Sequence, residues 1–162
     1  MLREAIKTQD AARTRFWRYG PVVLWMVLIW FASTSEFSAA NSSRLVRPIV
    51  LWLFPNISEL HLQLVHMVVR KAAHFGEYAV FGLLAARALS SSSRKLLRSY
   101  WFHASLLLIV IYALIDEYHQ SFISSRTSSF YDSGIDVAGG LFAIMLFTMV
   151  LKRRRQAKHP GG

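Results

Sequence analysis

Polar side chains of the types used in acid/base chemistry gather in three short stretches of otherwise apolar sequence, near residues 71–78, 116–126 and 132–136. Carboxylates and imidazoles at one place can act as general acid and base, and a nearby cation can hold an anionic group. The candidate catalytic residues are His74, Glu77, Asp116, Glu117 and His119. The candidate substrate-binding residues are Lys71, Tyr78, Gln120, Arg126, Asp132 and Asp136.

The spacing within each stretch fits one face of a helix. Lys71, His74 and Tyr78 recur at intervals of three and four residues, so a helix would carry them on one side, with Glu77 at the edge of that side. In the second stretch Glu117 lies about a quarter turn away from the shared face. The members of that second face are Tyr112, Asp116, His119 and Gln120.

The third stretch combines acidic residues with small ones. Asp132 and Asp136 share a face with Gly139 and Ala143, which are small enough to allow another helix to approach closely. Because ionisable groups are costly at membrane depth, we expect the three faces to meet in one polar pocket. The alternative interpretation is that these groups form buried ion pairs that only fix the register of the helices.

A metal site is the weaker interpretation of the same residues. Asp116, His119, His74 and Glu77 could supply nitrogen and oxygen ligands to zinc or another divalent ion. The sequence contains no H-E-x-x-H motif, so a metal ligand set is not assigned, and the cofactor stays unknown. The chain also has no cysteine, which excludes disulfides and cysteine-ligated metals.

The elements that must position these residues are long apolar segments. The chain is 54% hydrophobic, and its apolar residues are concentrated in runs that approach the ~20 residues needed to cross a bilayer. We predict an all-α membrane protein, a small bundle of four transmembrane helices. The predicted spans cover residues 16–32, 72–89, 100–120 and 132–151. Between the first two, residues 44–70 are predicted to form an interfacial or re-entrant segment.

The distribution of charge predicts the orientation. Most basic residues lie before residue 19, between 87 and 98, or after 151, and basic loops remain on the cytoplasmic side. Both termini are therefore predicted to be cytoplasmic, with the pocket on the opposite side. Residues 1–15 form a basic cytoplasmic segment, residues 16–151 the transmembrane domain and residues 152–162 a basic tail. The net charge of +10 favours contact with membrane lipids, and no basic surface of the nucleic-acid-binding type is present.

Two motifs resemble those of the VanZ-like family of membrane proteins. They are "KAAHFGEYAVFGLLA" (71–85) and "DEYHQSFISSRTSSFYDSGIDVAGGLFA" (116–143). One departure is that relatives often have Asn in the last helix, where this chain reads "DVAGG". The resemblance implies a multi-pass protein of the bacterial inner membrane, and the family's name-giving member is associated with resistance to teicoplanin, a lipoglycopeptide antibiotic.

Several functions fit these features. The first is an outward-facing site that binds or modifies an amphiphilic envelope substrate, such as a lipid-linked cell-wall precursor or a lipoglycopeptide. If the protein is an enzyme, we expect a hydrolase or transferase acting on a lipid-linked phosphate or ester. The alternative is a non-catalytic structural or partner-binding membrane module. Proton-coupled transport ranks last, because the polar groups cluster at one end of the helices instead of crossing the membrane. The sequence does not predict the oligomeric state.

Overall fold

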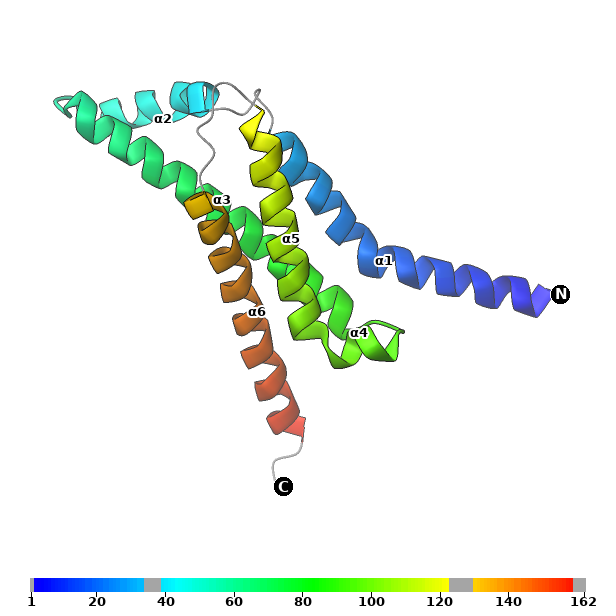
Figure 1. Ribbon diagram of the computed structural model, residues 1–162. Helices are drawn as coiled ribbons and strands as arrows, with labels where there is room; N and C mark the ends of the chain where they lie inside the picture. Colours follow the sequence, from blue (N-terminus) through cyan, green and yellow to red (C-terminus); the bar gives the residue numbers. More distant parts are fainter. Residues whose placement is uncertain (1, 34–38, 123–129, 159–162) are drawn as a thin grey trace.

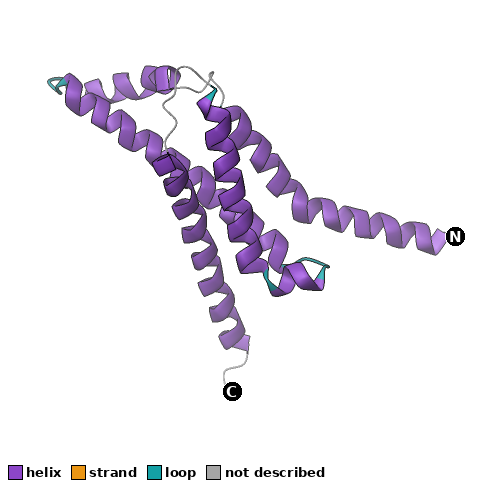
Figure 2. Ribbon diagram, in the orientation of Figure 1, coloured by secondary structure: helices purple, strands orange, loops and turns teal. Residues whose placement is uncertain are grey.

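The computed structural model describes residues 2–33, 39–122 and 130–158, and every regular element in these ranges is a helix (Figures 1 and 2). The prediction of an all-α fold is therefore confirmed. The helices are α1 (Leu2–Ala32), α2 (Ala39–Leu53), α3 (Glu59–Ser90), α4 (Lys95–Ser99), α5 (Trp101–Ser121) and α6 (Phe130–Lys158).

Helix α3 is the central helix of the fold. It packs against α1, α2, α5 and α6, and α5 also packs against α6 (Figure 1). The core between these helices contains Tyr78 and Phe81 of α3, Ile109 of α5 and Ile144 of α6, all of which are fully buried. Phe81 stacks edge-on against Tyr112, with 5.3 Å between the ring centroids, which joins α3 to α5. The polar stretches on α3, α5 and α6 are held together by this packing.

Two helices are long and apolar enough to cross a membrane within the part of the chain that the structure describes. They are α5 over Trp101–Ser121 and α6 over Tyr131–Arg154. Their outer sides expose apolar side chains such as Leu107, Ile111 and Met149, as lipid-facing surfaces do. The uncharged part of α1 begins only after Arg18, and the apolar part of α3 is interrupted by charged residues such as Lys71 and Glu77. The four-span arrangement with cytoplasmic termini stays a prediction.

Glycines allow α6 to lie directly on α3. A Cβ added to Gly82 of α3 would lie 2.5 Å from the carbonyl oxygen of Gly140 of α6, and a Cβ on Gly139 would collide with the carbonyl oxygen of Phe75. Backbone therefore meets backbone at two points that are two turns apart on α3. The close approach expected from Gly139 is present, and it brings the polar parts of the two helices together.

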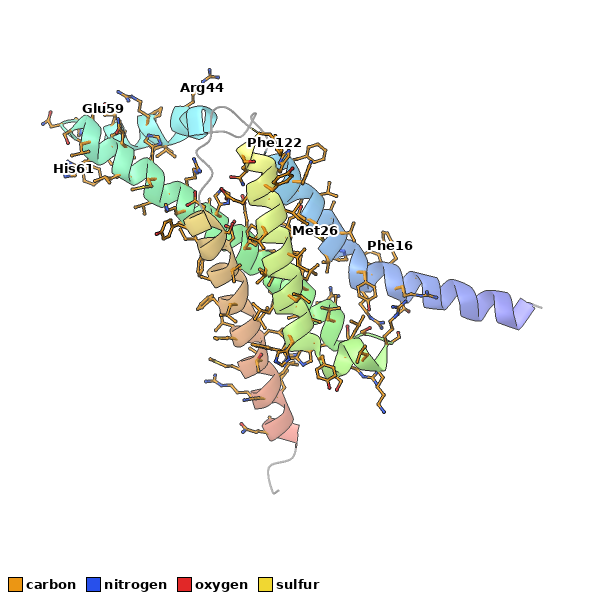
Figure 3. The ribbon with its side chains drawn as sticks, viewed as in Figure 1. Phe16, Met26, Arg44, Glu59, His61 and Phe122 are labelled. Carbon is orange, nitrogen blue, oxygen red and sulfur yellow. The ribbon has the colours of Figure 1, made fainter. Side chains whose placement is uncertain are left out.

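Helix α1 is bent. Figure 3 shows the bend between the labelled Phe16 and Met26, where Pro21 lies inside the helix. Proline has no N–H group and its ring crowds the preceding turn, so a kink at this position has a direct cause. The second half of α1 runs beside α3, where Trp25 donates a hydrogen bond to the carbonyl oxygen of Glu77 (2.9 Å).

The segment expected to be interfacial divides into α2 and the first part of α3. Helix α3 begins at Glu59, well before the predicted start near residue 72, because Ser58 caps it by accepting a hydrogen bond from the N–H of His61. Figure 3 places Glu59 and His61 at the end of α3 that lies farthest from α5. Arg47 of α2 pairs with Glu59 at 2.8 Å, which ties α2 to this end.

Candidate functional site

Asp116 of α5 lies at the centre of the polar residues. Its side chain is 1% exposed, and its Oδ2 accepts hydrogen bonds from Gln120 (2.9 Å) and from the Tyr78 hydroxyl of α3 (3.4 Å). Gln120 is one turn along the same helix, and it also donates to the Ser33 hydroxyl at the end of α1 (3.4 Å). Asp116 thus joins α5 to α3 directly, and it is linked through Gln120 to the end of α1.

His74 and Asp136 join the same cluster from α3 and α6. His74 Nδ1 lies 3.4 Å from Asp136 Oδ1, and the Asp136 side chain is almost fully buried. One ligand atom from each of His74, Asp116 and Asp136 can be chosen so that all three lie within 4.8 Å of one another. We call these three residues the triad.

A more exposed ion pair lies one turn away on α3 and α6. Lys71 Nζ is 3.1 Å from Asp132 Oδ1, and the guanidinium of Arg70 lies 3.8 Å from Asp132 Oδ2. The Lys71 side chain is 41% exposed, whereas Asp136 of the triad is 4% exposed. The polar region therefore changes along α3 from a partly solvated cation at Lys71, through the partly buried His74, to the fully buried Tyr78.

The other predicted residues lie around this centre. His119 is partly buried and stacks on Trp30 of α1, with ring centroids 3.9 Å apart and the planes at 22°. Glu117 is buried, so it lies on the inner side of α5 although its spacing takes it off the shared face. Glu77 is partly buried on α3. Arg126 lies outside the described residues.

Three residues near the cluster were not among the candidates from sequence. Ser33 and Trp30 come from the end of α1, where they contact Gln120 and His119. Ser133 of α6 is buried, and its hydroxyl has no hydrogen-bond partner among the described residues. Trp30 lies near the end of the first predicted span (16–32) that is expected on the same side of the membrane as the three polar stretches, and this was the signal that could have placed it here.

The geometry can support two kinds of chemistry. His74 beside Asp136 is an acid/base pair, and the second buried carboxylate at Asp116 adds a proton acceptor. The same three groups could also hold a divalent cation, with Asp116 Oδ1 available because it has no hydrogen-bond partner among the described residues. Within the cluster, Ser33 contacts Gln120 and the Ser133 hydroxyl has no hydrogen-bond partner among the described residues, so neither serine is paired with a base as a hydroxyl nucleophile would be.

Comparison with known proteins gave a family match. The family model described as VanZ/LLP1 matches residues 19–152, which is most of the chain and includes α3, α5 and most of α6. No curated protein and no solved structure matches the chain.

Proposed function

The chain belongs to the VanZ/LLP1 family, and we propose that its polar cluster is a site, open to the outer side of the bacterial inner membrane, that binds or modifies an amphiphile with an anionic head. Lipid-linked cell-wall precursors and lipoglycopeptides such as teicoplanin have this chemistry. The observation that carries the proposal is the triad, in which three helices bring His74, Asp116 and Asp136 within 4.8 Å.

The exposure and charge of the cluster change along the helices in a way that suits such a ligand. Lys71 and Arg70 are only partly buried and can attract an anionic head. Deeper between the helices, the triad provides groups that can take up and release protons, and Tyr78 provides a buried hydroxyl that donates to Asp116. The exposed apolar sides of α5 and α6 offer contact for the lipid part of the molecule. If the site is catalytic, hydrolysis or group transfer at a phosphate or ester fits these groups best.

The test is direct binding to the purified protein in lipid nanodiscs. The ligands are a polyprenyl-phosphate-linked wall precursor and teicoplanin, each measured with the wild type, with Lys71→Met and with Asp116→Asn. We expect at least about a tenfold loss of affinity for one ligand in both variants, which corresponds to about 1.4 kcal/mol or more. Lys71→Met removes the charge-assisted contact with the anionic head, whereas Asp116→Asn removes a charged acceptor for the hydroxyl and amide donors of the ligand. Arg47→Ala is the control, because Arg47 pairs with Glu59 at the far end of α3. Unchanged affinity in both variants for both ligands would reject the proposal.

A second candidate function is a non-catalytic module in which ion pairs hold the bundle. The contacts that favour it are Lys71 with Asp132 and His74 with Asp136, both of which join α3 to α6. Exchanging the first pair, as Lys71→Asp with Asp132→Lys, discriminates the two. A structural pair keeps its function when its charges are exchanged, whereas a site that binds an anion at Lys71 loses it. The readout is the change in teicoplanin susceptibility of a sensitive bacterium that expresses each variant.

A further inference from the structure

The triad contains more negative charge than its neighbours balance. Within the described ranges Asp116 receives hydrogen bonds only from the neutral groups of Tyr78 and Gln120, and no Lys or Arg pairs with Asp116 or Asp136. Two buried carboxylates then face one imidazole, and an uncompensated buried charge is strongly destabilising. An additional positive charge at this point would remove the imbalance.

We propose that His74, Asp116 and Asp136 bind a divalent transition-metal ion, with Zn²⁺ as the best fit. An imidazole with two carboxylates suits zinc, whereas Mg²⁺ and Ca²⁺ prefer oxygen ligands alone. Ligand atoms around a tetrahedral zinc are about 3.4 Å apart, given bonds of about 2.0–2.2 Å. The triad atoms lie within 4.8 Å, so rotamer adjustments can close the site. Asp116 Oδ1, buried and without a hydrogen-bond partner among the described residues, is the oxygen offered to the ion.

This inference rests on the proposed site and names a ligand for it. Three protein ligands leave at least one coordination position open, which is the pattern of zinc sites that act on a substrate. The bound ion would lie beside Lys71 and Arg70, so that a phosphate or carboxylate could contact both the cations and the metal. Metal binding and amphiphile binding are separate measurements, and either can fail while the other succeeds.

The test measures the zinc content of full-length protein purified without a histidine tag, by inductively coupled plasma mass spectrometry after incubation with zinc and removal of the excess. We expect about one zinc per chain in the wild type and in His103→Ala, a control that removes an exposed histidine of α5. In His74→Gln and Asp136→Asn we expect the zinc affinity to fall at least about tenfold. A wild-type content near zero, or equal contents in all four proteins, would overturn the proposal.

Thermal unfolding of the wild type and Asp136→Asn provides a second measurement. In metal-free protein the neutral Asn removes a buried, uncompensated charge, so its unfolding midpoint should be equal to or higher than that of the wild type. With zinc present the order should reverse, because the ion binds the wild type more tightly and therefore stabilises it more. A lower midpoint of Asp136→Asn under both conditions would instead identify Asp136 as the partner of a protonated His74, and would contradict the metal site.

A separate observation at the opposite end of α3 leads to a second inference. Two adjoining hollows of about 370 and 640 Å³ lie between the first half of α1, the end of α3 and the segment before α5. Their lining residues include five arginines and no acidic residue. These arginines are Arg13, Arg15, Arg18, Arg87 and Arg94.

Serine hydroxyls form the floor of the larger hollow. Ser92 is fully buried and shares a hydrogen bond of 2.8 Å with the Tyr19 hydroxyl, while Arg18 donates to the Ser93 hydroxyl at 2.7 Å. Trp17 beside it is 62% exposed, as an aromatic residue at a membrane surface would be. We infer that the hollow binds the headgroup of an anionic phospholipid, whose phosphate meets arginines and hydroxyls together.

Binding of headgroups can be measured by native mass spectrometry of the protein released from nanodiscs that contain phosphatidylglycerol and phosphatidylcholine in equal amounts. We expect retained phosphatidylglycerol on the wild type. The double variant Arg18→Gln with Arg94→Gln should retain about thirtyfold less, given about 1 kcal/mol for each basic residue at a membrane surface. Arg47→Ala should behave as the wild type. Equal retention of both lipids would overturn the inference. Displacement of phosphatidylglycerol by millimolar inorganic phosphate would also overturn it, because the site would then be one for free phosphate.

Discussion

The contact between Gly82 and Gly140 predicts opposite effects for two alanine substitutions on the same helix. A Cβ at Gly82 would lie 2.5 Å from the Gly140 carbonyl oxygen and 2.9 Å from its Cα, whereas a Cβ at Gly76 would meet nothing within 4 Å. Ordinary contact begins at 3.4 Å, so Gly82→Ala requires α6 to move by about 3.4 − 2.5 = 0.9 Å, since both clashing atoms belong to backbone.

The magnitudes follow from the local geometry. Alanine stabilises a helix by about 1 kcal/mol relative to glycine, so Gly76→Ala should raise the free energy of unfolding by up to that amount. In Gly82→Ala the same helix-propensity gain is outweighed by a loss of about 2–3 kcal/mol in the free energy of unfolding. The loss arises because a gap of nearly 1 Å removes a quarter to a half of the dispersion energy of each contact along the α3–α6 interface. The two variants should therefore differ by about 2–3 kcal/mol in the free energy of unfolding.

The assay is thermal unfolding in detergent, followed by helical circular dichroism. For a chain of this size 1 kcal/mol corresponds to about 2–4 °C, so the midpoint of Gly82→Ala should lie about 4–12 °C below that of Gly76→Ala. The same displacement would separate His74 from Asp136, because both lie near the close approach of α3 and α6. Equal midpoints for the two variants would refute the backbone contact and the helix crossing built on it.

Three further substitutions test individual contacts by the same unfolding assay. Tyr112→Phe removes the hydrogen bond that the hydroxyl donates to the Met26 carbonyl oxygen and should cost about 1 kcal/mol. Ser58→Ala removes the cap of α3 and should cost about 0.5–2 kcal/mol, with faster amide hydrogen exchange confined to the first turn of the helix. Arg47→Ala should cost less than about 1 kcal/mol, because Arg47 and Glu59 are 51% and 62% exposed; a larger loss would contradict the solvated state of this pair.

The helical faces were predictable from sequence because helix periodicity is local. Spacings of three and four residues placed Lys71, His74 and Tyr78 on one side of α3, and the structure brings these residues to partners on α5 and α6. The catalytic and binding roles assigned to these residues stay predictions.

The pairing between helices was not predictable in the same way. Whether Lys71 pairs with Asp132 or with Asp136 depends on the rotation of α6 and on its displacement along the α3 axis. The close contact of Gly139 with the Phe75 backbone constrains this rotation and this displacement. The burial of Glu117 was likewise not predictable from its spacing, because it depends on how α5 packs against both α3 and α6. The early start of α3 was missed because polar residues near its beginning break the apolar run.

The stack of Trp30 on His119 has a practical consequence, because it gives the polar cluster an intrinsic optical probe. Indole emission responds to the charge and polarity of a group in van der Waals contact, and here the rings are 3.9 Å apart. Four other tryptophans would have to be replaced by phenylalanine to isolate the signal, namely Trp17, Trp25, Trp52 and Trp101. In that background the emission of Trp30 would follow protonation, metal loading or ligand entry at the adjoining residues in real time, without any attached dye.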